Sequence, residues 1–317
     1  MLTLSNNRMI ARNREESVAL SREFTDLIKL VSAVLVAFCH YSAYALDFST
    51  NPVYRIMVLF AGDVGVALFF FLSGYGLMMS ERKRHLSFWA FLKRRLSKVY
   101  LPVVFVTFVW QLIIWPSGSG WERIPKMLYA VFWGFSDGTL WFVKVIMVCY
   151  VLFRIYLVSK GMKLPVLLLG TGVLCVFVYE CFASWAAISI PLFSLGVLVA
   201  DHNKLCCRLA RSAWVFAVVV AVTLLMVSLY IWQGNLYLHS LANWYVILAL
   251  IVACSFFKIE IGVPSSVSTI SYDIYLTHNK VLNYLRPVYP YVGLLHFVIG
   301  VAIAALASYT IRRLFRI

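Results

Sequence analysis

The feature that most constrains this chain is a succession of long apolar runs separated by short basic segments. A helix needs roughly 20 consecutive apolar residues to cross the hydrocarbon core of a membrane. Of the 317 residues, 62% are hydrophobic and only 13% are charged, which excludes an ordinary soluble enzyme, a disordered chain and a coiled coil. We therefore expect an all-α polytopic membrane protein. Its ten expected spans lie at about 27–46, 56–79, 96–115, 140–158, 164–182, 185–200, 213–232, 241–257, 267–285 and 291–311.

The placement of positive charge predicts how the chain crosses the membrane. The net charge of +15 would suit nucleic acid, but the Lys and Arg residues stand between the apolar runs rather than in one block. With the N-terminus in the cytoplasm, only Arg55, Arg123, Lys126 and Arg286 of the 28 basic residues lie in outside segments. This bias follows the positive-inside rule. We expect both termini in the cytoplasm and no nucleic-acid partner.

These features divide the chain into three expected parts. Residues 1–26 form a basic cytoplasmic segment, 27–311 a transmembrane domain of ten helices, and 312–317 a basic cytoplasmic tail. The longest polar connection, 116–139, contains Pro and Gly residues and is expected to be a loop with a short interfacial helix. The seven cysteines form no CxxC pair, so we expect neither a disulfide framework nor a metal site.

The first apolar run carries three ionisable residues, Asp26, Lys29 and His40. Such groups inside a membrane cost roughly 2.5–3.5 kcal/mol each on insertion scales, and they are therefore functional candidates. Helical geometry places Lys29 and His40 on one face, about 16.5 Å apart along the axis, and places Asp26 where it can pair with Lys29. A buried neutral imidazole can accept a proton, so His40 is a candidate base. Alternatively, His40 bonds a neighbouring helix and Lys29 extends to the interface.

The second and third runs hold further candidates. Ser73 and the glycine after it interrupt a bulky apolar run just before Tyr75, which suits either close helix packing or a ligand. Arg94, Arg95 and Lys98 stand at the expected cytoplasmic edge of the third span. There they suit membrane topology, an anionic lipid or a phosphorylated ligand.

Polar residues also mark the fourth and ninth runs. Trp141 begins the fourth span, where tryptophan is usually an interfacial anchor. Ser271, Tyr275 and His278 share one helical face of the ninth span. This polar stripe is expected to face the interior of the helix bundle.

Taken in order, these segments resemble the acyltransferase 3 family of integral membrane acyltransferases. The matching motifs are Asp-x-x-(Arg/Lys)-x10-His at 26–40, Gly-Val-x-Leu-Phe-Phe-x-Leu-Ser-Gly-Tyr at 65–75, Arg-Arg-x-x-Lys at 94–98 with Tyr100 and Pro102, Leu-Trp-Phe at 140–142, and Ser-Tyr-x-Ile-Tyr-Leu-x-His at 271–278. The resemblance covers essentially the whole chain. Lys29 and Lys98 stand where many members have Arg, which keeps the charge but loses the bidentate fork.

The resemblance implies transfer of an acyl group, most often acetyl, from cytoplasmic acyl-CoA to a hydroxyl of an envelope glycan or lipid-linked sugar. The expected location is the bacterial cytoplasmic (inner) membrane. Acyl-CoA would be a donor substrate, with no resident cofactor. Two alternatives stay open: a transporter or flippase of glycans or lipids, and a non-catalytic partner of a polysaccharide synthase.

The resemblance also implies roles for the candidate residues. His40 would act as general base or would itself be acylated, and Lys29 would orient the donor or neutralise developing charge. Arg94, Arg95 and Lys98 would bind the acyl donor. The residues expected to line or support the substrate pocket are Asp26, Ser73, Tyr75, Trp141, Ser271, Tyr275 and His278.

The charge bias yields a testable topology. In a variant without the native cysteines, Ser119→Cys should react with an impermeant thiol reagent added outside the cell, because 116–139 is expected outside. Ser87→Cys should react only after permeabilisation, since 80–95 is expected inside. Labelling of Ser87→Cys in intact cells would reverse the predicted orientation.

Overall fold

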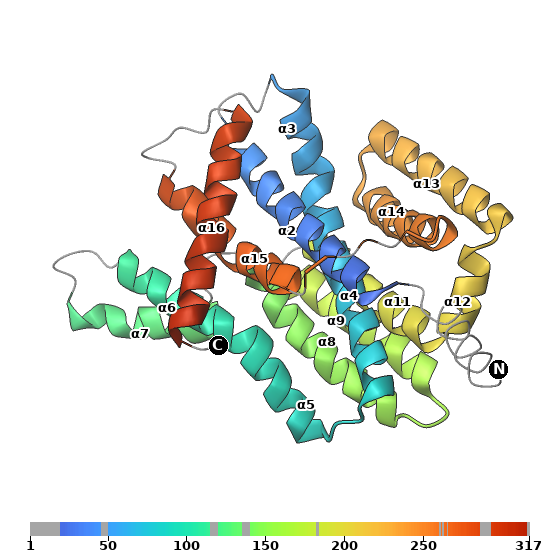
Figure 1. The fold of residues 1–317 in the computed structure, drawn as a ribbon, viewed down its shortest axis with the longest axis horizontal. Helices are drawn as coiled ribbons and strands as arrows, with labels where there is room; N and C mark the ends of the chain where they lie inside the picture. The colour runs from blue at the N-terminus through green and yellow to red at the C-terminus, as the bar shows by residue number, and fades with distance from the viewer. Residues whose placement is uncertain are drawn as a thin grey trace, which may run out of the picture. The chain divides into compact units, whose positions relative to one another are not determined.

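Helices are the regular elements of the chain (Figure 1). The computed structural model describes residues 20–45, 50–114, 120–134, 140–181, 184–259, 261, 263–264, 266–285 and 293–315. Within these ranges no strand is present, and the all-α prediction is confirmed. Residue 119 and most of the predicted segment 1–26 lie outside the described residues.

Eight helical stretches in the described part are long and apolar enough to cross a membrane. They are α2 (Arg22–Tyr44); α3 (Pro52–Ile56), η1 (Met57–Ala61) and α4 (Gly62–Lys83) as one stretch; α5 (Phe88–Arg95), η2 (Leu96–Tyr100) and α6 (Leu101–Ile113) as one stretch; α8 (Trp141–Val158); α9 (Lys163–Cys181); α10 (Ser184–Ala187) with α11 (Ile190–Asp201); α13 (Ala213–Gln233); and α14 (Leu236–Phe256). The chain is therefore a multi-pass membrane protein.

The two other expected spans also form helices, α15 (Ser266–Leu285) and α16 (Gly293–Phe315). Helix α15 is less apolar because it carries Asp273, His278 and Lys280, and the apolar part of α16 is limited to Gly293–Ala307. The count of ten spans thus stays a prediction.

Shorter helices occupy two of the connections. The 116–139 connection contains η3 (Trp121–Arg123), α7 (Ile124–Tyr129) and η4 (Ala130–Gly134), in line with the short helix expected there. Helix α12 (Asn203–Ala210) follows α11.

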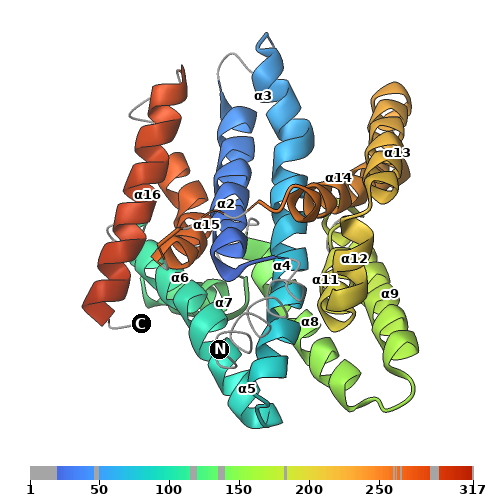
Figure 2. The same cartoon turned by 45° about the vertical axis from the view of Figure 1, so that its right-hand side comes forward.

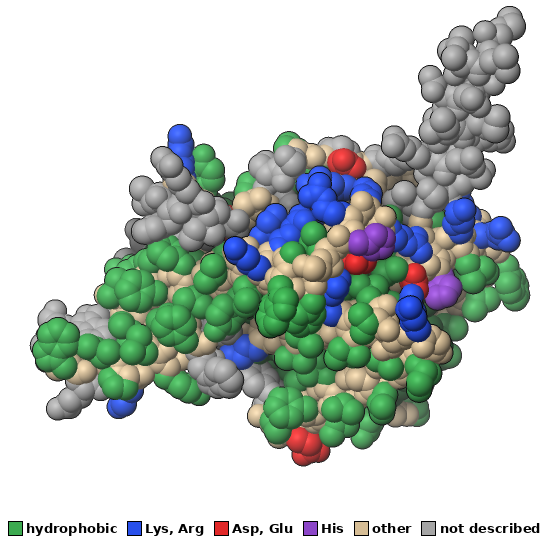
Figure 3. Space-filling view, turned by 90° about the horizontal axis from the view of Figure 1, so that it is seen from below, with side chains coloured by type: hydrophobic (Ala, Val, Ile, Leu, Met, Phe, Trp, Pro, Cys, Tyr) green, Lys and Arg blue, Asp and Glu red, His purple; other side chains and the backbone are tan. Residues whose placement is uncertain are grey.

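Helix α13 shows the kind of surface that lipid covers. Leu224 and Ile231 are 64% and 70% exposed, and Trp214 and Trp232 are exposed near opposite ends of the helix. The helical rise between the two tryptophans is about 27 Å, close to the ~30 Å thickness of the hydrocarbon core. Hydrophobic side chains likewise make up much of the surface seen in Figure 3. Exposed apolar residues between interfacial tryptophans are typical of a membrane span.

Local sequence signals set helix ends. The Ser87 hydroxyl caps α5 by accepting the Ala90 N–H at 3.3 Å. Gly234 ends α13 at φ +67°, a left-handed conformation that glycine adopts without strain. The Asn235 side chain then caps α14 by accepting the Leu238 N–H at 2.9 Å. These two adjacent residues reverse the chain and join α13 to α14.

Two compact units make up the fold. Unit 1 is drawn from residues 1–29, 66–84 and 167–267, and unit 2 from residues 30–65, 85–166 and 268–317. Helices α2 and α4 contribute residues to both units, because the boundaries fall inside these helices.

In unit 1, α4 and α11 cross at two glycines. A methyl group on Gly74 would collide with the carbonyl oxygen of Phe193, and one on Gly196 would collide with that of Phe71. Small residues let two backbones approach closely, and such contacts hold helices together in lipid. Close helix packing is therefore the role that the structure gives to Gly74.

In unit 2, α15 lies among α2, α8 and α16 (Figure 2). Every side chain from Asp273 to Lys280 is buried. A helix with this many polar residues would be costly facing lipid, so its neighbours shield it.

The α4–α11 crossing predicts different outcomes at two glycines of one helix. Gly74→Ala should lower the midpoint of thermal unfolding in detergent, because overpacking costs about 1–3 kcal/mol. Gly76→Ala is the matched control, since a methyl group there meets open space. Equal unfolding midpoints for the two variants would contradict the close approach of α4 and α11 at Gly74.

Candidate active site

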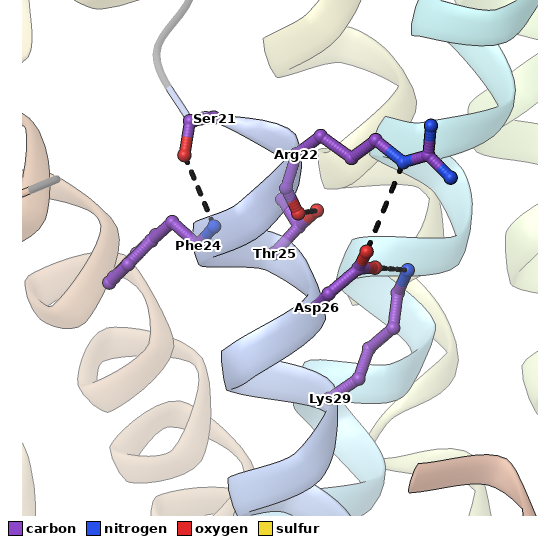
Figure 4. A network of polar contacts seen from close by, with 6 residues as sticks. All are labelled: Ser21, Arg22, Phe24, Thr25, Asp26 and Lys29. Carbon is purple, nitrogen blue, oxygen red and sulfur yellow. Dashed lines mark hydrogen bonds and ion pairs between the residues drawn. The ribbon is translucent and has the colours of Figure 1, made fainter. Parts of the chain in front are cut away.

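The start of α2, in unit 1, holds a cluster of charged side chains (Figure 4). The Lys29 Nζ donates to the Asp26 carboxylate at 2.9 Å, so the predicted pair is present. Arg22 Nε lies 3.9 Å from the other carboxylate oxygen of Asp26. The Asp26 side chain is only 6% exposed and that of Lys29 is 32% exposed. A buried carboxylate is thus held between two cations of its own helix.

Unit 2 brings two histidines together from opposite ends of the sequence. The rings of His40 on α2 and His278 on α15 have their centres 5.3 Å apart and stack at 28°. His278 is fully buried, and His40 is half-buried. The base predicted from the sequence therefore has an imidazole as its immediate neighbour.

The contacts of His278 define its neutral form. Its Nδ1 lies 3.0 Å from the carbonyl oxygen of Ile274 and 2.8 Å from that of Tyr275. A carbonyl oxygen only accepts hydrogen bonds, so Nδ1 carries the proton in the neutral ring. The lone pair of the ring then lies on Nε2. Two contacts to its own helix fix the plane that His278 presents to His40.

The predicted stripe of α15 faces the interior of unit 2. Ser271, Tyr275 and His278 are all buried. The Tyr275 ring packs edge-to-face on Phe142 of α8, with centres 5.6 Å apart, and lies 6.0 Å from the His278 ring. Trp141, next to Phe142, is only 6% exposed, unlike the usual interfacial anchor. These residues belong to the surroundings of the histidine pair.

The opposite face of α15 is polar and buried as well. Asp273, Thr277 and Lys280 recur at helical spacing and are buried. The Thr277 hydroxyl lies 2.8 Å from the Asp273 carbonyl oxygen and 3.0 Å from that of Ala304 on α16. The sequence analysis predicted the stripe of Ser271, Tyr275 and His278 but not this second one. The i, i+4, i+7 spacing was the signal that could have revealed it.

The predicted donor-binding cations do not share one environment. The Arg95 guanidinium lies over two aromatic rings, 5.5 Å from the centre of Phe91 and 5.4 Å from that of Tyr150. Arg94 is half-buried and Lys98 is exposed. Lys98 lies in η2, a π-helical turn that directly follows Arg95 and changes the helical register. The structure therefore separates the inward Arg95 from the outward Lys98.

Comparison with known families identifies the fold that carries these residues. A family model described as an acyltransferase domain, that of the acyltransferase 3 family, matches residues 22–313. The chain belongs to the acyltransferase 3 family. The protein is thus a membrane acyltransferase, and the resemblance noted in the sequence is confirmed. No curated protein and no solved structure matched the chain.

The family match of this acyltransferase begins at Arg22, the first residue of α2, and includes every predicted site residue. Unit 2 contributes most of them, namely His40, Arg94, Arg95, Lys98, Trp141, Ser271, Tyr275 and His278. Unit 1 contributes Asp26, Lys29, Ser73 and Tyr75. Arg22 was missed by the sequence reasoning, although its spacing from Asp26 is that of a helical ion pair.

Tyr75 supports the start of α2. Its hydroxyl oxygen accepts the Leu20 backbone N–H at 3.3 Å, and its side chain is buried. Ser73, two residues earlier on α4, is half-buried. The Ser73–Tyr75 segment therefore serves helix packing through Gly74 and anchors the chain near residue 20.

The cysteine pair of α12 does not suit an acyl-carrying nucleophile. Burial raises the pKa of both the Cys206 and the Cys207 thiols. The thiolate is the nucleophilic form, and a raised pKa makes it scarce at neutral pH. Within the described residues no three His, Cys, Asp or Glu side chains are arranged to hold a metal ion.

The cluster in Figure 4 makes a prediction about stability. Asp26→Asn should lower the midpoint of thermal unfolding in detergent. The substitution replaces the buried carboxylate with a neutral amide, so Lys29 loses its ion-pair partner. The cost should be about 1–2 kcal/mol, below that of a fully buried pair, since Lys29 is partly exposed. Glu23→Gln is the matched control, because it removes one exposed carboxylate from the same helical turn. If both variants lowered the unfolding midpoint equally, the Asp26–Lys29 ion pair would not contribute specifically to stability.

Proposed function

We propose that this protein transfers an acyl group, most simply acetyl, from cytoplasmic acyl-CoA to a hydroxyl of an envelope glycan or lipid-linked sugar. The proposed site of action is the bacterial cytoplasmic (inner) membrane. The observation that carries the proposal is His40, a motif residue of a membrane acyltransferase, stacked on the buried imidazole of His278. An imidazole next to a polar, sheltered helix is a group that can move a proton away from water.

In the proposed reaction His40 acts as general base. The attacking hydroxyl oxygen forms a bond to the thioester carbonyl carbon while His40 takes the hydroxyl proton. The carbon–sulfur bond then breaks, and the thiolate of coenzyme A leaves and recovers the proton. In an alternative route His40 is acylated first, and the sugar hydroxyl then attacks the acyl-imidazole. Both routes consume one thioester and release one ester and one thiol.

His278 supports this role of His40. Its neutral form, with Nδ1–H directed at the carbonyl oxygens of residues 274 and 275, places no positive charge beside the base. Its fixed plane limits the orientations open to the His40 ring. We therefore treat His278 as a positioning residue and Tyr275 as part of the wall behind it.

Lys29 is assigned to the donor rather than to the bond-breaking step. A rise of 1.5 Å per residue along α2 separates it from His40 by about 16.5 Å. Its ammonium group is also engaged by Asp26 at 2.9 Å. A cation at this distance from the base suits contact with a remote, anionic part of a long thioester donor.

The decisive substitution is His40→Ala. It should lower the rate of acyl transfer at least about 10²–10⁴-fold, the usual cost of losing a general base, and abolish it if His40 is acylated. Binding of coenzyme A should stay within about two-fold, since His40 is not assigned to the phosphates. The measurement is acylated product formed per unit of monodisperse, detergent-purified protein.

His202→Ala is the matched control, because His202 is exposed and follows α11, away from the motif residues of the sequence. It should retain the activity of the unsubstituted protein. Near-normal turnover by His40→Ala would contradict the proposed mechanism, in which His40 is the general base or is itself acylated. Export of glycan without thioester consumption would instead favour the transporter alternative.

A further inference from the structure

In unit 2, the third span and helix α15 meet at two points and run in the same direction between them. The Tyr272 hydroxyl donates to the carbonyl oxygen of Val99, which lies in η2 just before α6, at 2.6 Å. Further along, the rings of Trp110 on α6 and Tyr284 on α15 meet edge-to-face with centres 6.2 Å apart. The two contacts are eleven residues apart on one segment and twelve on the other. The helical rise therefore keeps the two segments level with each other along this interface.

Two buried polar side chains lie at one level of this interface. Asn279 follows Tyr272 by seven residues, which is about 10.5 Å of helical rise. Thr107 follows Val99 by eight residues, which is about 12 Å. Seven residues nearly complete two helical turns, so Asn279 shares the face of α15 that carries Tyr272. Thr107 precedes Trp110 by three residues and shares its face of α6. The two side chains thus stand on facing sides of the two helices.

The hydrogen-bonding capacity of both side chains is left open by the protein. Thr107 is 0% exposed and Asn279 is 6% exposed. Among the described residues, the Thr107 Oγ1 and the Asn279 Oδ1 have no hydrogen-bond partner. By contrast, the buried hydroxyl of Thr277, also on α15, bonds two carbonyl oxygens. Burying a polar atom without a hydrogen bond is costly. The arrangement therefore favours a ligand that supplies the missing hydrogen bonds.

The two open atoms match a hydroxyl group. An amide oxygen only accepts hydrogen bonds, whereas a threonine hydroxyl both donates and accepts. A ligand hydroxyl can therefore donate to Asn279 and accept from Thr107 at the same time. An ionised phosphate has no proton to donate to the amide oxygen, and an acyl chain would leave both atoms unbonded. Of these ligand groups, the hydroxyl alone satisfies both residues.

The level of Asn279 on α15 is also that of the histidine pair. Asn279 directly follows His278, whose ring stacks on that of His40 with centres 5.3 Å apart. Consecutive helical positions differ by about 100°, so His278 meets α2 while Asn279 shares the face of Tyr272. A sugar carries hydroxyls on neighbouring carbons. It can thus present one hydroxyl to His40 and another to the Thr107–Asn279 pair.

We propose that Thr107 and Asn279 bind a non-reacting hydroxyl of the acceptor sugar, an inference that rests on the proposed function. The hydroxyls of a sugar are chemically alike, so selecting one for acylation requires a second point of contact that recognises the others. The pair would thereby help to decide which hydroxyl reaches His40. The pantetheine arm of the donor also carries a hydroxyl, and a bound water offers the same hydrogen bonds. The experiment separates these three sources.

The test compares KM values for acceptor and donor, using the full chain purified in detergent. The acceptor probe is the oligosaccharide released from the native cell envelope, and the donor is acetyl-CoA. Thr107→Val and Asn279→Leu should each raise the KM for the oligosaccharide about three- to ten-fold, the loss typical of one hydrogen bond. The KM for acetyl-CoA should stay unchanged. Thr107→Ser should behave like the unsubstituted protein, because it keeps the hydroxyl.

The matched control is Thr277→Val, which removes a buried hydroxyl of α15 that bonds backbone carbonyls. It should leave both KM values unchanged and lower the midpoint of thermal unfolding. Thr107→Val should not lower that midpoint in the absence of substrates, since it removes a buried polar atom that has no partner among the described residues.

Three outcomes would overturn the inference. An unchanged KM for the oligosaccharide in both variants would exclude contact with the acceptor. A lower unfolding midpoint for Thr107→Val, together with that unchanged KM, would assign the pair to a bound water. A raised KM for acetyl-CoA, with no change for the oligosaccharide, would assign the pair to the pantetheine arm.

The two proposals fail separately, because binding of the oligosaccharide is also measured by titration calorimetry. If the unsubstituted protein binds the oligosaccharide through Thr107 and Asn279 and releases no thiol from acetyl-CoA, the proposed function fails and the hydroxyl site stands. If it transfers acetyl groups and neither substitution changes the KM for the oligosaccharide, the hydroxyl site fails and the proposed function stands.

Discussion

Unit 2 depends on one constraint. The polar helix α15 must be buried within a protein whose other helices are mostly apolar. Helix α15 carries Asp273, His278 and Lys280, and each ionisable group would cost several kcal/mol if it faced lipid. Neighbouring helices therefore cover it: His40 of α2 stacks on one face, and the backbone of α16 at Ala304 accepts a hydrogen bond on the other. The same packing that buries α15 places the half-buried ring of His40 against the buried ring of His278.

In the proposed function, proton transfer belongs to the histidine pair and donor recognition belongs to basic residues elsewhere in the chain. His40 and His278 stack on each other, and backbone carbonyls fix the neutral tautomer of His278 alone. Binding of the acyl donor by Arg95, whose guanidinium lies over the Phe91 ring, stays a proposal. A long thioester donor suits such a separation, because its charged nucleotide and its acyl carbon lie at opposite ends.

The sequence predicted the local features well, because they depend on residues close together in the chain. Apolar runs of about 20 residues mark the helices, and the spacing of Asp26 and Lys29 predicts their ion pair. The stack of His40 on His278 joins α2 to α15 across most of the sequence, and no local period encodes it. The sequence also could not predict that Arg95 packs on Phe91. Arg94 and Arg95 are adjacent arginines, and only their packing in the fold distinguishes them.

The central claim, that this membrane acyltransferase moves an acyl group from coenzyme A to a sugar hydroxyl, is tested most directly by following the thioester itself. Purified protein is mixed with acetyl-CoA and an envelope glycan acceptor in detergent, where no gradient exists, and free thiol and acetyl ester are measured together. We expect one thiol to be released for each ester formed. Folded protein that binds coenzyme A and releases no thiol with any glycan acceptor would contradict it.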